Sequence, residues 1–268
     1  MSGPFGGRAR APGVILVAMD PANDSPPSGP VRLVGFDADD TLWRSQDYFD
    51  AAQAEFERIV GAYVDLHDAR VHERLYEVEK GNLALFGYGV KGMALSMVEA
   101  AVAITDARIQ AVDLHRIVGL GKDLLRHPVE LLPGVPEAVE AIAEHFDVVL
   151  ITKGDLFHQE AKVRQCGLAD RFRRIEIVSE KDPGTYARVL GEFGLPPASF
   201  VMIGNSLRSD IAPVLELGGW GIHTPYHTTW AHEALADVAH DAPRLVRTAS
   251  AAEWVDAVSR IARMAAGR

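Results

Sequence analysis

The chain of 268 residues has a single cysteine, Cys166, and no long apolar run. One cysteine cannot form an internal disulfide, and its place at the predicted end of a helix favours packing over a nucleophilic role. No segment reaches the roughly 18 apolar residues that a membrane-spanning helix needs. Residues 14–19 are apolar but too short and poorly flanked for a signal peptide. We therefore expect an unexported, soluble protein of the reducing cytoplasm.

Positive charge is also scarce in this sequence. The chain contains 27 Lys and Arg residues against 37 Asp and Glu residues, which gives a formal net charge of −10. This balance disfavours nucleic acid or a membrane surface as a partner, and a small anionic substrate must be attracted by local charge only. The length suits one large domain or a core with an insertion. Neither composition nor length determines the oligomeric state.

The first 30 residues differ in composition from the remainder. Residues 1–30 are rich in Gly, Pro, Ala and Ser and lack the apolar content that a fixed structure requires. We expect them to form a disordered leader. The sequence leaves open whether the chain starts at Met1 or at Met19.

An apolar run at residues 31–36 ends in a cluster of acids that includes Asp37 and Asp39. The run has the length of a buried strand in a parallel sheet, and ligand sites in such sheets form beyond the carboxyl ends of the strands. Because strand residues two apart point the same way, both side chains can converge on one centre. Two anions so close together require a cation, and Mg²⁺ binds one or two carboxylates together with a phosphate. The alternative is that the acids are only the solvated end of a strand.

From residue 128 onward, apolar runs of strand length alternate with helical patterns. Strands are expected near 147–152, 175–178, 200–203 and 219–222, and helices near 156–166, 183–193 and 209–217. A short edge strand is expected at 244–247, before a final helix that contains Trp254, Val258 and Ile261. This alternation predicts an α/β fold, a doubly wound parallel sheet with helices on both faces.

Residues 46–127 show helical periodicity only. Apolar residues recur at helical spacing in four stretches: Phe56, Ile59, Val60 and Tyr63; Val71, Leu75 and Val78; Leu95, Val98 and Val102; Ile109, Val112, Ile117, Leu120 and Leu124. We predict a helical domain at 46–127, inserted into a core domain made of residues 31–45 and 128–268. We call this inserted domain the cap, which is the role that the family resemblance described below implies for it.

The least regular part of the predicted cap is residues 86–92, where three glycines accompany Phe86, Tyr88 and Lys91. Glycines permit a tight loop, and we expect this loop to reach the active site and to set substrate specificity. The alternative is that Phe86 and Tyr88 pack between cap helices while Lys91 is solvated.

Four short motifs in a fixed order resemble those of the haloacid dehalogenase-like (HAD) hydrolase superfamily. They are Asp37-Ala38-Asp39-Asp40-Thr41, Thr152 at a predicted strand end, Lys181 before a predicted helix, and Gly204-Asn205-Ser206-Leu207-Arg208-Ser209-Asp210. Four ordered motifs are far more specific than one. The resemblance covers about residues 31–265 and implies a Rossmann-like core with an inserted cap. One position departs from the pattern, because Asn205 stands where the family usually has Asp.

The resemblance also implies a role for each motif. Asp37 is the expected nucleophile, and Asp39 is the expected acid and base, whose backbone carbonyl also binds the metal. Thr152, Lys153 and Lys181 are expected to bind the phosphate. Mg²⁺ is the expected cofactor. Its expected ligands are Asp37, Asp39, Asn205 and Asp210.

These roles predict a Mg²⁺-dependent phosphatase that acts on a small phosphorylated metabolite through an aspartyl-phosphate intermediate. A dehalogenase is disfavoured, because the resemblance associates that chemistry with enzymes that lack the second acid, Asp39. A phosphomutase uses the same core residues, and a lysine of the cap such as Lys80 or Lys91 leaves open a phosphonate-cleaving enzyme. Asn205 leaves open a non-catalytic phosphate- or protein-binding module. The sequence does not determine the natural substrate.

Overall fold

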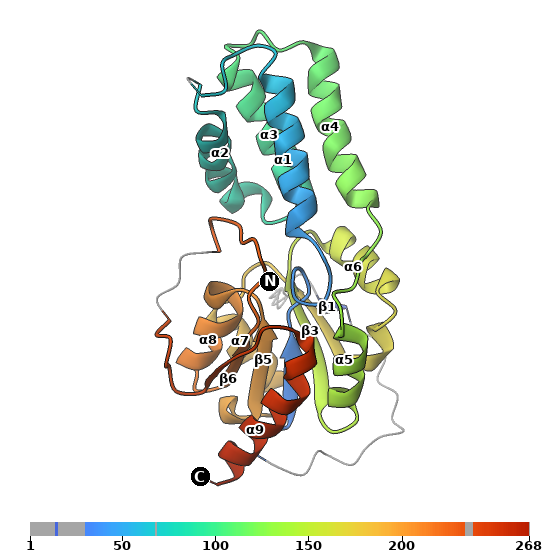
Figure 1. Ribbon diagram of the computed structural model, residues 1–268, viewed down its shortest axis with the longest axis vertical. Helices are drawn as coiled ribbons and strands as arrows, with labels where there is room; N and C mark the ends of the chain where they lie inside the picture. The colour runs from blue at the N-terminus through green and yellow to red at the C-terminus, as the bar shows by residue number, and fades with distance from the viewer. Residues whose placement is uncertain (1–13, 16–29, 68, 234–237, 268) are drawn as a thin grey trace, which may run out of the picture.

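The computed structural model describes residues 14–15, 30–67, 69–233 and 238–267, and its strands form one sheet (Figure 1). The strands of this described part are β1 (Val14–Ile15), β2 (Leu33–Phe36), β3 (Asp147–Lys153), β4 (Arg174–Val178), β5 (Phe200–Gly204), β6 (Trp220–His223) and β7 (Leu245–Arg247). Their order across the sheet is β1-β4-β3-β2-β5-β6-β7. Every neighbouring pair is parallel except β1 with β4. The predicted parallel sheet is confirmed, including the short edge strand β7.

Strand β2 lies at the centre of the sheet, between β3 and β5. Phe36 at its end is in register with Leu150 of β3 and Ile203 of β5. All four residues of β2 are buried, as expected for a strand covered on both faces. Gly35 leaves the space that the side chain of Phe200 fills, since a Cβ at this glycine would lie 2.6 Å from the Phe200 ring. This register brings the motifs that follow the three strands to one edge of the sheet.

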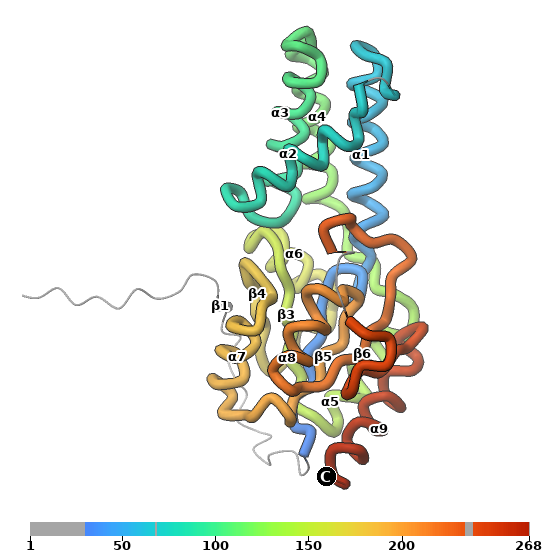
Figure 2. The backbone as a smooth tube through the Cα atoms, turned by 90° about the vertical axis from the view of Figure 1, so that its left-hand side faces the viewer, coloured from blue at the N-terminus to red at the C-terminus, as the bar shows by residue number. Residues whose placement is uncertain are grey.

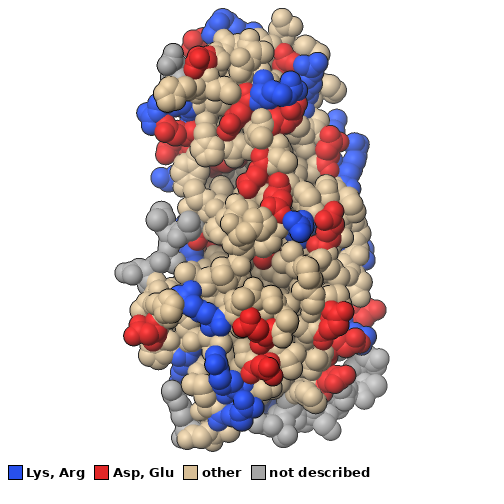
Figure 3. Space-filling view, in the orientation of Figure 1, with Lys and Arg blue, Asp and Glu red and all other residues tan. Residues whose placement is uncertain are grey.

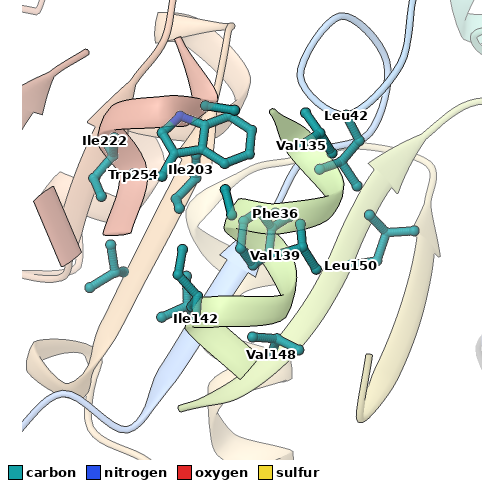
Figure 4. Close-up of a cluster of buried hydrophobic side chains, with 14 of the residues drawn as sticks. Phe36, Leu42, Val135, Val139, Ile142, Val148, Leu150, Ile203, Ile222 and Trp254 are labelled. Carbon is teal, nitrogen blue, oxygen red and sulfur yellow. The ribbon is translucent and has the colours of Figure 1, made fainter. Parts of the chain in front are cut away.

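Helices cover both faces of the sheet. On one face lie α5 (Val135–Ala143), α6 (Leu156–Gln165) and α9 (Trp254–Ala266), and on the other lie α7 (Pro183–Glu192) and α8 (Ala212–Glu216). Figure 4 shows the first of these cores, in which Phe36 and Trp254 pack with ring centroids 5.8 Å apart. The doubly wound arrangement is confirmed.

The expected helix at 209–217 is divided into a π-helical turn, η3 (Leu207–Ile211), and α8. Pro213 has no N–H group and so cannot bond to the carbonyl oxygen of Ser209, four residues earlier. The hydroxyl of Tyr186 donates a hydrogen bond of 3.0 Å to that oxygen instead. Tyr186 is fully buried, so this contact fixes the fourth motif against α7. Short 3-10 helices complete the core: η1 (Ala169–Arg171), η2 (Pro197–Ser199) and η4 (Ala251–Glu253).

Four helices follow the first motif and stand together at one end of the molecule (Figures 1 and 2). They are α1 (Gln46–Val60), α2 (Val71–Phe86), α3 (Val90–Ile104) and α4 (Ala111–Arg126). They share an apolar core of their own, which includes Phe56, Leu75, Met97 and Ile117. A separate core is what an inserted cap requires, because each domain must bury its own apolar faces.

The helix predicted from Leu95, Val98 and Val102 is α3, but of these three residues only Val98 packs against the apolar core of the cap. Leu95 is 51% exposed and Val102 is 37% exposed, whereas Met97, Ala100 and Ala101 are buried. Helix α3 packs against both α2 and α4, and its small residues allow the neighbouring helices to approach closely. The large side chains of Leu95 and Val102 therefore lie on the exposed face of α3, and its buried face is made largely of smaller residues. Val112 of α4 is likewise exposed, at 55%.

The predicted leader falls mostly on residues 1–13 and 16–29, which lie outside the described residues. Its described pair, Val14–Ile15, forms β1 and pairs with Ile175 and Glu176 of β4, a contact that the leader prediction did not include. Cys166 is buried, and burial raises the pKa of its thiol, which suits a packing role. Among the described helices, none combines the length and the apolar character needed to cross a membrane.

Charged side chains of both signs occur on the cap and on the core in the face shown by Figure 3.

Candidate active site

A cavity of about 210 Å³ lies between the carboxyl ends of the strands and the cap helices. Its core side is lined by residues from all four motifs: Asp37, Asp39, Thr152, Lys181, Asn205 and Asp210. Helices α1, α2 and α3 supply much of its other wall. The structure therefore brings together the predicted catalytic, phosphate-binding and metal-binding residues, whose individual roles stay predictions.

The turn after β2 is fixed by local hydrogen bonds. The amide of Asp37 donates to the carbonyl of Ile203 at 2.9 Å, which continues the pairing of β2 with β5. Asp40 takes a left-handed backbone conformation with φ 62°, and its carboxylate accepts from the amides of Ser45 and Gln46 at 2.8 and 2.9 Å. An anion at the first amides of α1 stabilises the start of that helix. Asp40 therefore joins the turn after β2 to the first helix of the cap, and burial raises its pKa to about 7.

Lys181 bridges two buried carboxylates. Its ammonium group pairs with Asp37 and, at 2.7 Å, with Asp210. Burial and the nearby charge of Asp210 raise the pKa of Asp37 to about 7, although Lys181 opposes the change. Burial alone would lower the pKa of Lys181, but its attraction to both acids raises the pKa above its usual value. The lysine thus stays charged and holds the expected nucleophile in place.

Asp39 is held by three side chains that sequence reasoning did not identify. Lys162 donates to it at 2.5 Å, Gln159 at 2.7 Å and the indole of Trp43 at 2.6 Å. Burial raises the pKa of Asp39, but Lys162 and these hydrogen bonds bring the pKa below its ordinary value. Gln159 and Lys162 lie three residues apart on α6, which follows the second motif. That helical spacing was the available signal, because it places both on one face near the sheet edge.

Thr152 and Lys153 end strand β3. Thr152 is buried and accepts a hydrogen bond from Gln159 at 3.2 Å. The ammonium group of Lys153 pairs with Glu233 at 2.7 Å and lies 4.1 Å from the centre of the Tyr88 ring. The sequence predicted only that the backbone amide of Lys153 binds the phosphate, and these contacts of its side chain were not predicted.

Glu233 is a further residue that the sequence did not indicate. It accepts hydrogen bonds from Ser206 and Ser209, each at 2.6 Å, and pairs with Lys153. Although burial opposes the change, Lys153 and the two serines lower the pKa of Glu233 to about 2. Glu233 follows a region of irregular composition, so no periodic or motif signal marked it. It connects the second motif to the fourth.

Asn205 lies beside the first motif. Its backbone N–H donates to the hydroxyl of Thr41 at 3.0 Å, and that hydroxyl donates to Asp37 at 2.9 Å. Asp210 accepts from the amide of Ser206 at 2.9 Å. Gly204 is required here, because a Cβ at this position would collide with the carboxylate of Asp210. Asn205 thus occupies the place of the family acid without distorting the motif.

The oxygen atoms at this edge fit a hard divalent cation. Asp37 and Asp210 contribute carboxylates, Asn205 an amide oxygen and Asp39 a backbone carbonyl, which are the ligand types that Mg²⁺ prefers. Within the described ranges, no three or more His, Cys, Asp or Glu side chains are arranged as a metal-binding group by themselves. A cation at this edge would therefore also need the amide oxygen of Asn205 and the backbone carbonyl of Asp39.

The loop predicted to set specificity reaches the site through one of its three named residues. Tyr88 lines the cavity, and its hydroxyl donates to Glu180 of the core at 2.8 Å. Phe86 is 48% exposed, and Lys91 pairs with Asp155 at 3.0 Å. Neither Phe86 nor Lys91 is among the residues that line the cavity. Tyr88 contacts the core rather than packing between cap helices, and Lys91 is ion-paired rather than only solvated.

An α/β core that gathers such residues beneath a helical cap defines a class of capped hydrolases. The family model for haloacid dehalogenase-like hydrolases matches residues 31–218. The chain therefore belongs to the haloacid dehalogenase-like hydrolases, and it is an enzyme of that family.

Several solved structures are similar to the chain. A haloacid dehalogenase-like family hydrolase from Xanthomonas campestris is 54% identical, with a TM-score of 0.82, over 90% of this chain and 100% of that one. A 2-haloacid dehalogenase from Pseudomonas syringae pv. Tomato DC3000 is 21% identical, with a TM-score of 0.55, over 86% and 99%. A predicted phosphoglycolate phosphatase from Haemophilus somnus 129PT is 16% identical, with a TM-score of 0.54, over 86% and 99%. The last two share the fold alone. No curated protein was found to match the chain.

Proposed function

We propose that this hydrolase is a Mg²⁺-dependent phosphatase that cleaves a small phosphate monoester through an aspartyl-phosphate on Asp37. The observation that carries the proposal is the carboxylate of Asp39, which lines the same cavity as Asp37. A leaving alkoxide needs a proton, and an attacking water must lose one. A dehalogenase releases a halide ion, which needs no proton, so it has no use for this carboxylate as a proton donor.

The charge of the cavity supports a divalent cation. Among the described residues, seven carboxylates and three lysines line it, and each lysine is already ion-paired: Lys153 with Glu233, Lys162 with Asp39, and Lys181 with Asp210. A phosphate dianion would meet net repulsion in such a site. When bound by Asp37, Asp39, Asn205 and Asp210, Mg²⁺ would supply the positive charge that the phosphate requires.

The residues of the chain then have these roles. A carboxylate oxygen of Asp37 attacks phosphorus, the ester P–O bond breaks, and the leaving alkoxide takes a proton from Asp39. A water then attacks phosphorus and gives its proton to Asp39, while the bond between phosphorus and Asp37 breaks and inorganic phosphate leaves. The hydroxyl of Thr152 and the amide of Lys153 donate hydrogen bonds to the phosphoryl oxygens.

The ion pair between Lys162 and Asp39 favours the second step over the first. It stabilises the carboxylate form, which accepts the proton of water. The first step requires Asp39 to have taken up a proton beforehand. Esters whose leaving groups need no proton should therefore react faster than alkyl esters.

Hydrolysis of p-nitrophenyl phosphate tests the proposal. We expect release of inorganic phosphate with Mg²⁺ and none after addition of EDTA. Asp37→Asn should lower kcat by at least about a thousandfold, because it removes the attacking oxygen. The exposed Asp170 on η1 offers a matched control, and Asp170→Asn should leave kcat unchanged. Mass spectrometry of acid-quenched enzyme should find the phosphoryl group on Asp37.

Other products would identify other members of the family. Chloride release from 2-chloropropionate without phosphatase activity would indicate a dehalogenase. Transfer of phosphate to a second alcohol without free phosphate would indicate a phosphomutase. Unchanged turnover in Asp37→Asn would contradict the assigned nucleophile.

A further inference from the structure

The cap side of the cavity carries polar side chains that the reaction does not use. Helices α1, α2 and α3 contribute Gln46, Gln53, Glu79, Asn82 and Ser96 to the cavity wall. Figure 1 shows these helices above the strand ends that carry the catalytic motifs. A small ester bound with its phosphate at Asp37 would therefore direct its leaving group toward this wall. We call these five residues the cap wall.

Most side-chain hydrogen-bond donors of the cap wall are already engaged, and one N–H of Gln46 is without a partner among the described residues. The amide nitrogen of Gln46 donates to Asp50 at 2.7 Å, and that of Gln53 donates to Glu57 at 3.2 Å. The amide nitrogen of Asn82 donates to Glu99 at 2.7 Å. Carboxylates only accept hydrogen bonds, so these contacts fix which amide atom is nitrogen.

Ser96 contributes one further donor to the cap wall, its hydroxyl group. It donates to the carbonyl of Gly92 at 2.9 Å and accepts from Asn82 at 3.1 Å. Within the described residues, the amide oxygens of Gln46, Gln53 and Asn82 accept no hydrogen bond from the protein. The unused capacity of the cap wall therefore consists mainly of acceptors, namely the three amide oxygens and the carboxylate of Glu79.

Glu79 is the charged member of the cap wall. Among the described residues, its carboxylate forms no hydrogen bond or ion pair, and no Lys or Arg of the cap lines the cavity. Burial raises the pKa of Glu79 to about 7, against a smaller opposing effect of His72. A partly desolvated carboxylate without a partner favours a ligand that donates to it.

From this geometry we infer that the substrate is a phosphate monoester whose leaving group carries hydrogen-bond donors, and that Glu79 recognises these donors. The inference rests on the proposed phosphatase function. Hydroxyl and ammonium groups are both donors of this kind. A carboxylate on the leaving group would instead face Glu79 and three amide oxygens. Phosphoglycolate and 2-haloacids bear such a carboxylate, and this wall therefore disfavours them as substrates.

The test compares four esters on the full-length enzyme with Mg²⁺. Glycerol 3-phosphate carries hydroxyl donors, phosphoethanolamine an ammonium donor, 2-phosphoglycolate a carboxylate, and p-nitrophenyl phosphate no donor. We expect kcat/KM for at least one donor-bearing ester to exceed that for 2-phosphoglycolate by about tenfold or more, as one charge-assisted hydrogen bond can supply. A higher kcat/KM for 2-phosphoglycolate than for both donor-bearing esters would overturn the inference.

Variants of Glu79 identify the donor. Glu79→Gln should lower kcat/KM for the preferred ester about tenfold more than for p-nitrophenyl phosphate, mainly through KM. A loss confined to phosphoethanolamine identifies an ammonium group, and a loss for glycerol 3-phosphate identifies hydroxyls. Glu79→Lys should reverse the preference toward 2-phosphoglycolate. The exposed Glu77 of the same helix supplies the control Glu77→Gln, for which no ratio should change.

The outcomes separate this inference from the proposed function. Unchanged ester ratios in Glu79→Gln, with the fold verified by circular dichroism, would overturn the role of Glu79 while leaving the phosphatase intact. Gln has nearly the same shape as Glu, so Glu79→Gln should fold. The comparison of ester ratios in this variant therefore does not depend on whether Glu79→Lys folds. Failure to hydrolyse any of the four esters would overturn the proposed function, and the inference with it.

Discussion

Replacement of Lys181 by Met should destabilise the metal-free protein strongly. The side chain of Lys181 is 2% exposed, and those of its partners Asp37 and Asp210 are 9% and 1% exposed. Met has a similar length but no charge, so both carboxylates would remain buried without a cation. Removing one partner of a buried ion pair costs about 3–5 kcal/mol. We expect a loss of this size in the free energy of unfolding at pH 8.5.

The ion pair between Lys162 and Asp39 provides a matched comparison. Asp39 is 30% exposed and keeps its hydrogen bonds with Gln159 and Trp43 when the lysine is removed. Water and these donors screen the remaining charge, so Lys162→Met should cost only about 1 kcal/mol. Urea unfolding monitored by circular dichroism, with EDTA present, measures both variants under one set of conditions.

The pH dependence of the stability lost in Lys181→Met gives a second check. In the wild type, the pKa of Asp37 is raised from 3.8 to about 7, so the folded state binds a proton more tightly than the unfolded chain. Such a group lowers the free energy of unfolding as pH rises through the window between these two values. Without Lys181 the carboxylate should hold its proton more tightly still, and the loss should be smaller at pH 5.5 than at pH 8.5. Equal losses for the two lysine variants, or a loss for Lys181→Met independent of pH, would refute this reasoning.

Two further predictions concern the chemistry of the site. Asp39→Asn should slow alkyl phosphate esters at least tenfold more than p-nitrophenyl phosphate, because only an alkoxide needs a proton from Asp39; equal losses of kcat/KM for both esters would remove that role. Asn205→Asp should tighten Mg²⁺ binding by about 1–3 kcal/mol, since it restores a charged ligand, without a matching rise in kcat. Calorimetric titration of Mg²⁺ measures the second effect, and equal affinities would show that position 205 does not contact the metal.

Much of the fold could be predicted from local patterns in the sequence. The run at 31–36 and the strands and helices after residue 128 occur where periodicity placed them, because burial between helices requires apolar strands and amphipathic helices. The expected helical insertion consists of α1 to α4. Helix α3 was predicted but its buried face was not, since close helix packing uses small residues that a search for large apolar side chains overlooks.

The sequence by itself determined that four motifs end or follow the strands of a parallel sheet, and hence that Asp37, Thr152, Lys181 and Asp210 meet. This follows because the carboxyl ends of parallel strands share one edge. Only the tertiary structure decided that Lys162 and Gln159 hold Asp39, that Glu233 holds Lys153, and that the cap wall presents acceptors. Periodicity is a property of neighbouring residues, whereas an ion pair depends on which distant side chains packing brings within about 3 Å of each other.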